Sequence, residues 1–243
     1  MLANAINVMF KRKQIKDPPS FNWMKFQDNS MNYTANEDVL FEKVPVSVVL
    51  TTIKRRKEFV NSFVLPSIHA NNPSEIIIVD DEELGIQNKR NKGAGLAKQD
   101  YIFFCDDDVI IPKNHLNLLY KTIIESDCAF AYTDYQAIVF QETSHILRKN
   151  YYHNASDFDL EKLKKKNYID TCSLVKKSIF CGFDPDIKRF QDWDLWLTLS
   201  LRGYKGLYVK GTGIMKFYFD SGITSSAKLK DCKDIILKKH NIT

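Results

Sequence analysis

The stretch Tyr101-Ile-Phe-Phe-Cys-Asp-Asp-Asp108 decides the fold, because a short apolar run ends abruptly in three acidic residues. Apolar runs of this length are typical of strands that are buried on both faces of a sheet. Val46-Ser-Val-Val-Leu50 and Ile76-Ile-Ile-Val79 are two further runs of the same kind. Together the three runs predict neighbouring strands in a sheet that is covered on both sides.

Segments with a helical spacing of apolar residues separate these runs. Residues 57–70, residues 87–98 and the segment that starts at Pro112 are predicted to be helices. Pro66 is expected to bend or end the first of them. The alternation predicts an α/β fold with a mixed, mainly parallel central sheet and helices on both faces.

Composition and apolar patterning divide the chain into three parts. Residues 1–43 are polar and rich in Asn and are predicted to form an N-terminal extension. Residues 44–226 contain the strands and helices of the main domain. Residues 227–243 are predicted to form a C-terminal amphipathic helix with lysines on its outer side.

Composition limits the possible functions. Hydrophobic residues make up 44% of the 243 residues, which excludes global disorder. The net charge of +5 fits a phosphate-bearing ligand or an anionic membrane surface, whereas the scattered basic residues give no reason to expect nucleic acid. The five cysteines contain no Cys-x-x-Cys pair, and no run approaches the ~20 apolar residues of a membrane span. A cytoplasmic protein is expected, with peripheral membrane contact as an open alternative.

Acidic residues gather where two of the predicted strands end. Asp80 and Asp81 follow the second strand, and Asp106, Asp107 and Asp108 follow the third. Ligands of open α/β sheets bind beyond the carboxyl ends of the strands. Crowded carboxylates need a cation, and no Lys or Arg adjoins the triplet, so a divalent metal is predicted. A single acid at a strand end would instead be read as a turn former or cap.

The chemistry of the predicted site follows from its ligands. All-oxygen ligation favours Mg²⁺ or Mn²⁺. Asp106 and Asp108 are two apart on an extended segment and would converge on the ion, while Asp107 faces elsewhere. No glycine-rich phosphate loop is present, so a metal that bridges two phosphates and neutralises a diphosphate leaving group is the remaining interpretation. Arg90 is expected to assist, and Lys89 is interpreted as an exposed residue of a helix start.

Several segments, in a consistent order, resemble the nucleotide-binding half of the family 2 glycosyltransferases. They are Val46-Ser-Val-Val-Leu-Thr-Thr52, Ile76-Ile-Ile-Val-Asp-Asp81, Arg90-Asn-Lys-Gly93, Ile102-Phe-Phe-Cys-Asp-Asp-Asp108 and, later, Asp192-Trp-Asp-Leu-Trp196. Each segment alone is weak, but the ordered set over residues 44–226 is specific. The resemblance implies the GT-A fold, a Rossmann-like α/β architecture.

The resemblance implies roles in donor binding. Asp80 or Asp81 would contact the nucleotide base, usually uracil, and Thr51 would line the nucleoside pocket. Arg90 would lie near the ribose or the phosphates. The acidic triplet is similar to the Asp-x-Asp motif of the family: Asp108 would bind the metal, Asp106 would face both ribose and metal, and Asp107 would lie at the donor.

The resemblance also implies a catalytic residue. Asp192 matches the general base that takes the proton from the acceptor hydroxyl in inverting members of the family. Asp194 is interpreted as an acid favoured by the helix dipole, and Trp193 and Trp196 as core residues. The expected activity is metal-dependent, inverting transfer of a sugar from a nucleotide diphosphate donor, most simply a UDP-sugar, to an acceptor hydroxyl.

Two positions depart from the family pattern. Gln191 stands where the family usually has Glu before the base. Asp220 stands in the segment where the family often has a His that completes the metal site, and it is predicted as a third ligand. The acceptor, which could be a glycan, a lipid-linked molecule or a protein, cannot be read from the sequence.

Two other functions stay open. A sugar-phosphate nucleotidyltransferase would share the sheet and the metal, but residues 51–58 lack the glycines of its basic loop. A non-catalytic protein that binds sugar nucleotides would explain Gln191 and the missing His. Asp192 and the acidic triplet favour an active enzyme over both.

Overall fold

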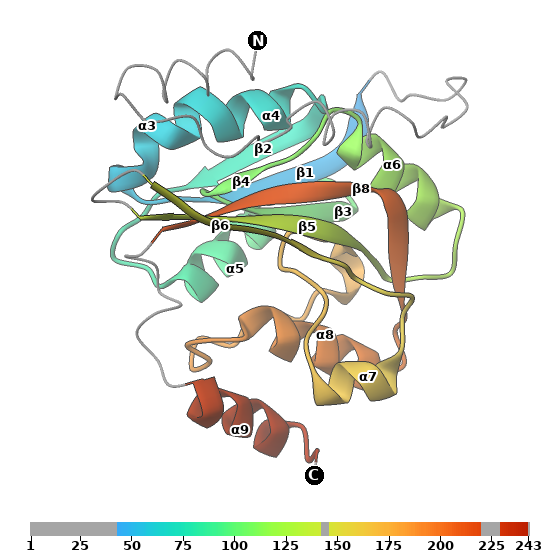
Figure 1. Ribbon diagram of the computed structural model, residues 1–243. Helices are drawn as coiled ribbons and strands as arrows, with labels where there is room; N and C mark the ends of the chain where they lie inside the picture. The colour runs from blue at the N-terminus through green and yellow to red at the C-terminus, as the bar shows by residue number, and fades with distance from the viewer. Residues whose placement is uncertain (1–42, 142–145, 220–228, 243) are drawn as a thin grey trace.

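The computed structural model describes residues 43–141, 146–219 and 229–242, so almost all of the predicted N-terminal extension lies outside it. Within the described residues, eight strands form one sheet in the order β2-β1-β3-β7-β5-β8-β4, with β6 beside β5 (Figure 1). The strands are β1 Val44–Thr51, β2 Pro73–Val79, β3 Tyr101–Asp106, β4 Val109–Ile110, β5 Phe130–Gln141, β6 Ile146–His153, β7 Leu174–Lys176 and β8 Gly206–Phe219. The helices are α3 Lys57–Phe59, α4 Leu65–His69, α5 Ile86–Leu96, α6 His115–Ile124, α7 Leu160–Lys165, α8 Gln191–Leu201 and α9 Leu229–Lys239.

The three apolar runs of the sequence form the parallel part of the sheet. β1 lies between β2 and β3 and is parallel to both. Thr51 at the end of β1 is in register with Val79 on one side and Asp106 on the other. The carboxyl ends of the three strands therefore share one edge, as predicted.

The rest of the sheet mixes directions. β7 is antiparallel to both β3 and β5, β5 is parallel to β8, and β4 is antiparallel to β8. The predicted α/β fold with a mixed sheet is confirmed. The antiparallel pairing matters for the site, because it brings the late strand β8 next to the chain that follows the acidic triplet.

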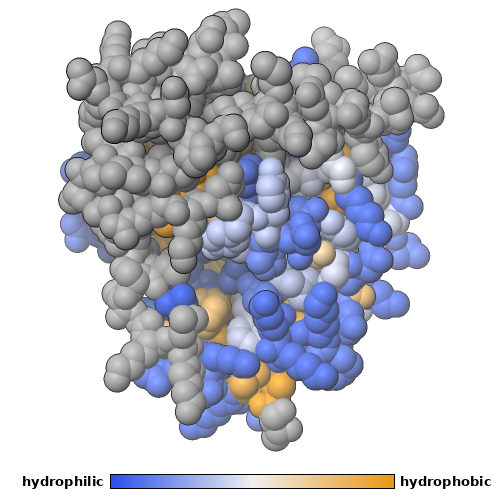
Figure 2. Space-filling model, viewed as in Figure 1, coloured by the Kyte–Doolittle hydropathy of each residue, from blue (hydrophilic) through white to orange (hydrophobic). Residues whose placement is uncertain are grey.

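Helices cover both faces of the sheet (Figure 1). On one face α4 and α6 pack on side chains such as Val48 and Leu50. On the other face α5 and α8 pack on alternate residues such as Val49 and Phe104. Trp196 of α8 is fully buried and stacks on Phe130 at 4.7 Å between ring centroids, so its predicted core role is confirmed. Over the described residues that face the viewer, the surface is largely hydrophilic (Figure 2), as expected when apolar side chains turn inward.

Pro66 was expected to bend or end its helix, but the helical segment continues past it to His69. The helical segment of residues 57–69 changes from α3 to a π-helical turn over Val60–Val64 and resumes as α4, with Pro66 in the first turn. A proline has no N–H to donate and is tolerated where a helix begins. The π turn therefore lets the segment continue past the proline while it stays packed on the sheet.

Helix α9 is attached to helix α8 through the buried carboxylate of Asp194. Asp194 accepts from Lys239 Nζ and pairs with His240 Nε2, each at 2.8 Å. Asp194 lies in the first turn of α8, where the helix dipole favours an acid. The interpretation of Asp194 from the helix dipole was incomplete, because its carboxylate makes its main contacts with Lys239 and His240, far along the chain. The predicted C-terminal helix is thus an integral part of the described fold.

The close approach of α5 to β1 depends on Gly93. A Cβ atom on Gly93 of α5 would overlap the side chain of Val49 in β1, whereas a Cβ on Gly95 of the same helix would meet nothing within 4 Å. Helix α5 also carries Arg90, so its distance from β1 sets the position of that side chain.

We expect Gly93→Ala to lower the free energy of unfolding by about 1–3 kcal/mol, because the added methyl group overpacks the α5–β1 contact. Gly95→Ala is the matched control and should be neutral or stabilising by up to ~1 kcal/mol, as alanine favours a helix. Urea denaturation of both variants measures the difference. Equal stabilities would show that the packing contact is not tight.

Candidate active site

A cavity of about 820 Å³ lies beyond the carboxyl ends of β1 and β3. Its wall also includes residues before α8, the segment before β7 and part of β8. The predicted residues that line it are Thr51, Arg90, Asp106, Asp107, Asp108 and Asp192. Asp220 lies outside the described residues. The structure therefore brings six of the predicted site residues, including the predicted base, to one cavity.

Asp80 and Asp81 do not reach this wall. Asp80 is exposed, and Asp81 pairs with Lys92 at the surface with 3.1 Å between Oδ2 and Nζ. The next acid, Glu82, lines the cavity, and its Oε1 accepts from the backbone N–H of Lys54 at 2.9 Å. The turn after β2 thus presents an acid to the cavity two residues later than the resemblance implied for Asp80.

Arg90 joins three elements at the floor of the cavity. Its Nη2 lies 2.6 Å from Asp106 Oδ1, and its Nη1 donates to Gln191 Oε1 at 2.8 Å. The guanidinium also lies over the ring of Phe183, 5.1 Å from the centroid. Arg90 on α5 therefore fixes the end of β3 and the start of α8 relative to each other. Gln191, the departure from the family pattern, takes part in this link as a neutral acceptor.

The acidic triplet does not continue the strand. β3 ends at Asp106, and Asp107 and Asp108 form a turn before β4. The expected alternation of side chains therefore stops at Asp106, and all three carboxylates line the cavity. Asp107 is held by Thr52, whose Oγ1 donates to Oδ2 at 3.2 Å. The expectation that Asp107 faces away was wrong, because it assumed an extended chain.

The three carboxylates have different electrostatic environments. Burial would raise the pKa of Asp106, but Arg90 and Lys216 outweigh it and lower the value. Burial raises the pKa of Asp107, against the charge of Arg56. Burial and the neighbouring charge of Asp106 raise the pKa of Asp108 to about 7. Asp108 is thus the carboxylate of the triplet whose negative charge is least compensated.

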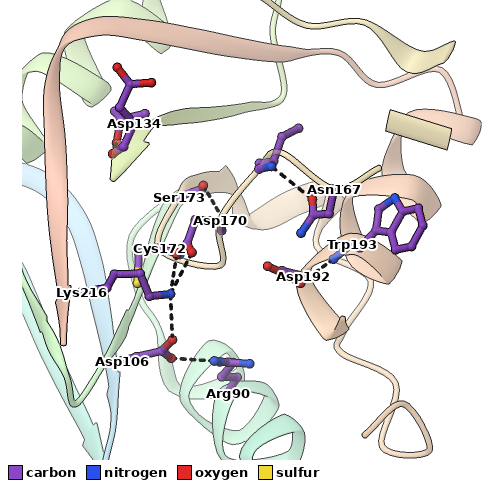
Figure 3. A network of polar contacts seen from close by, with 12 residues as sticks. Arg90, Asp106, Asp134, Asn167, Asp170, Cys172, Ser173, Asp192, Trp193 and Lys216 are labelled. Atoms are coloured by element: carbon purple, nitrogen blue, oxygen red, sulfur yellow. Dashed lines mark hydrogen bonds and ion pairs between the residues drawn. The ribbon is translucent and has the colours of Figure 1, made fainter. Parts of the chain in front are cut away.

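Lys216 was missed by the sequence analysis and lies between Asp106 and Asp170 (Figure 3). Its Nζ is 2.8 Å and 3.0 Å from the two oxygens of Asp170, and 3.8 Å from Asp106 Oδ2. Burial opposes the charged form, but Asp170 and other neighbours raise the pKa of Lys216 well above its usual value. The available signal was a single lysine within the apolar strand segment Ile214-Met-Lys-Phe217, where a buried lysine needs a partner.

Asp192 lies at the start of α8, opposite the acidic triplet. Phe190 before the helix has a left-handed backbone (φ 63°), which turns the chain into the first helical residues. Such strain in a residue other than glycine persists only where surrounding contacts impose it. The Asp192 carboxylate accepts from the Trp193 N–H at 2.8 Å. Burial, followed by the charge of Asp170, raises the pKa of Asp192 to about 6.

Two further side chains complete the cavity edge. Lys89 is only 3% exposed, and its Nζ donates to the Thr52 carbonyl at 2.8 Å. Its interpretation as an exposed residue was wrong, because the start of α5 faces the end of β1. Thr51 is also buried in the wall, and its Oγ1 has no hydrogen-bond partner among the described residues. A buried hydroxyl without a partner is unusual and fits contact with a ligand.

Comparison with known proteins gives a family and a fold. Residues 64–183 match the sequence model of the family described as Glycosyl transferase family 2. Two similar solved structures are TarS 1–349 of S. aureus in complex with UDP-GlcNAc (12% identity, TM-score 0.54) and TarS 1–349 of S. aureus (11% identity, TM-score 0.51). These matches cover 80% and 81% of this chain, and 66% and 70% of the respective TarS chains. No curated protein matches the sequence significantly.

No helix in the described residues is long and apolar enough to cross a membrane.

Replacing Arg90 by lysine tests its role as a link. We expect Arg90→Lys to lower the free energy of unfolding by about 1–3 kcal/mol, since one ammonium cannot replace the planar contacts to both Asp106 and Gln191. Lys92→Arg on the exposed side of the same helix is the control and should change little. Thermal unfolding of the two variants measures the effect. An Arg90→Lys variant as stable as the unmodified protein would contradict the role of Arg90 as a link.

Proposed function

We propose that this chain, which has the GT-A fold and matches the family 2 glycosyltransferase model over residues 64–183, transfers a sugar from a UDP-sugar to an acceptor hydroxyl. The observation that carries this proposal is one cavity that is lined both by the acidic triplet Asp106, Asp107 and Asp108 with Arg90 and by Asp192 at the start of α8. The similar fold of TarS, solved with UDP-GlcNAc, supports a UDP-sugar as the donor class.

Thr51, Glu82 and Asp106 are proposed to bind the nucleoside part of the donor. The partnerless hydroxyl of Thr51 and the cavity position of Glu82 support this assignment. Asp80 and Asp81 stay predictions that need the turn after β2 to move toward the cavity. Arg90, which touches Asp106, would hold the ribose and phosphate side of the site in place.

A divalent metal, Mn²⁺ or Mg²⁺, is common in this family, and the residues fit it in part. Asp106 is engaged by Arg90 and Lys216, which leaves Asp108 as the acid suited to a metal. In the described residues, no three His, Cys, Asp or Glu side chains converge on a common metal position. A metal held by Asp108 would take its other ligands from donor phosphates and water, which is usual for Mg²⁺. When bound, it would neutralise charge on the diphosphate.

Asp192 is proposed as the general base. In this scheme its carboxylate accepts the proton of the acceptor hydroxyl as the hydroxyl oxygen attacks the anomeric carbon of the donor sugar. The bond from that carbon to the diphosphate breaks, and its electron pair leaves with UDP. One displacement of this kind inverts the anomeric configuration. The contact with the Trp193 N–H holds the carboxylate at the start of α8, and its raised pKa suits proton acceptance near neutral pH.

Asp192→Asn tests the proposed base. The amide cannot accept the proton, so we expect the turnover number to fall by about 10²–10⁴-fold. UDP affinity should stay within about twofold of the unmodified protein, because the amide keeps the shape of the side chain. Asp186→Asn, at an exposed site in the preceding loop, is the control. Unchanged turnover would remove the role of Asp192. UDP binding without turnover in the unmodified protein, with a panel of UDP-sugars and acceptors, would favour the non-catalytic alternative.

The pH dependence of turnover gives a second test. Asp192 must be ionised to act, and its pKa is raised to about 6, so turnover should fall as the pH drops through about 6. The measurement is the initial rate at saturating donor and acceptor across the acidic and neutral range. A rate that stays constant down to the pH at which the protein unfolds would contradict a base with this pKa.

A further inference from the structure

Lys216 is a buried cation in the middle of an acidic cavity wall. It lies on β8 with 9% of its surface exposed, and it lines the cavity. Burying an ammonium group is costly unless it is paired and hydrogen-bonded. The surrounding carboxylates meet that requirement, so this lysine carries a fixed positive charge.

The ammonium has bonding capacity left over. It has three N–H donors, and Asp170 takes two of them at 2.8 Å and 3.0 Å. Asp106 Oδ2 lies at 3.8 Å, within ion-pair distance but too far for a hydrogen bond. The ring of Tyr135, 5.8 Å from Nζ, adds a weak electrostatic contact. One N–H of Lys216 is therefore available to an oxygen that enters beside Asp106.

The charge of the cavity wall indicates which ligand could supply this oxygen. Six acidic residues line the cavity: Glu82, Asp106, Asp107, Asp108, Asp170 and Asp192. A diphosphate can enter such a wall only beside cations. The terminal nitrogens of Arg90 are already bonded to Asp106 and Gln191. Lys216 is thus a buried cation beside Asp106 that retains a donor for a phosphate oxygen, in a wall that also holds the buried side chains of Lys89 and Arg90.

We propose that Lys216 binds the diphosphate of the nucleotide donor directly, as a protein-held cation beside the acidic triplet. The proposal rests on the proposed function, since it assumes a nucleoside diphosphate in this cavity. It places on β8 a positive charge beside the diphosphate, whereas the sequence analysis had expected that charge from a metal assisted by Arg90. UDP should consequently bind more tightly than uridine even when divalent metal has been removed.

A purely structural role for Lys216 gives different expectations. The Lys216–Asp170 ion pair also ties β8 to the segment before β7. If this structural contact were the only role of Lys216, removing either partner of the ion pair would have the same effect on the affinity for the diphosphate. Asp170→Asn breaks the pair but keeps the ammonium, whereas Lys216→Met removes the ammonium.

The experiment is calorimetric titration of the full chain with UDP and with uridine, in EDTA and in Mn²⁺. In EDTA the unmodified protein should prefer UDP over uridine. Lys216→Met should reduce UDP affinity at least about tenfold, as expected for loss of a charge-assisted hydrogen bond, and leave uridine affinity unchanged. Lys216→Arg and Asp170→Asn keep a cation and should keep the preference for UDP. Thermal unfolding of each variant verifies that it is folded.

Three results would overturn the proposal. They are equal affinity for UDP and uridine in EDTA in the unmodified protein, an unchanged preference for UDP in Lys216→Met, and an equal loss of preference in Lys216→Met and Asp170→Asn. The first result needs no variant, so the test holds even if Lys216→Met does not fold. A fourth result, UDP binding that depends wholly on Mn²⁺, would also end the role of Lys216, but it would leave the proposed function intact. Absence of binding by UDP and uridine in both conditions would instead end the proposed function.

Discussion

The chain of buried ion pairs from Arg90 through Asp106 and Lys216 to Asp170 is the interaction on which the site depends (Figure 3). It connects α5, the end of β3, the late strand β8 and the segment before β7. A buried charge left without its partner costs several kcal/mol, so each member of the chain constrains the positions of the others. The carboxyl edge of the sheet is therefore a single electrostatic unit, although its parts come from distant places in the sequence.

The elements around this electrostatic unit restrict the positions of its members. Gly93 allows α5 to lie close against β1, which sets the depth of Arg90. Gln191 receives the second contact of Arg90 and so ties the start of α8 to the same unit. Behind α8, the contacts of Asp194 with Lys239 and His240 hold the helix from its other side. Asp192 projects from a helix that is held by contacts at both faces, which suits the general base that we propose.

The sequence predicted the parts of this arrangement that depend on local pattern. Apolar runs identified the strands β1, β2 and β3, and strand direction alone placed Thr51 and the acidic triplet at one edge. Turn geometry was not predictable in the same way: Asp107 faces the cavity because the chain turns after Asp106, and Glu82 lines the wall in place of Asp80. Lys216 and Asp170 were missed because their meeting depends on the antiparallel part of the sheet. No local pattern specifies that pairing, although a lone lysine in an apolar strand was a visible signal.

The central claim is that this cavity binds a uridine diphosphate donor. The most direct measurement is calorimetric titration of the unmodified chain with UDP, GDP and dTDP in the presence of Mn²⁺. Saturable binding of UDP, with much weaker binding of the other two nucleotides, is the result that the proposed function predicts. Binding of none of the three would contradict the claim, and the acidic triplet would then be only a turn at the end of a strand.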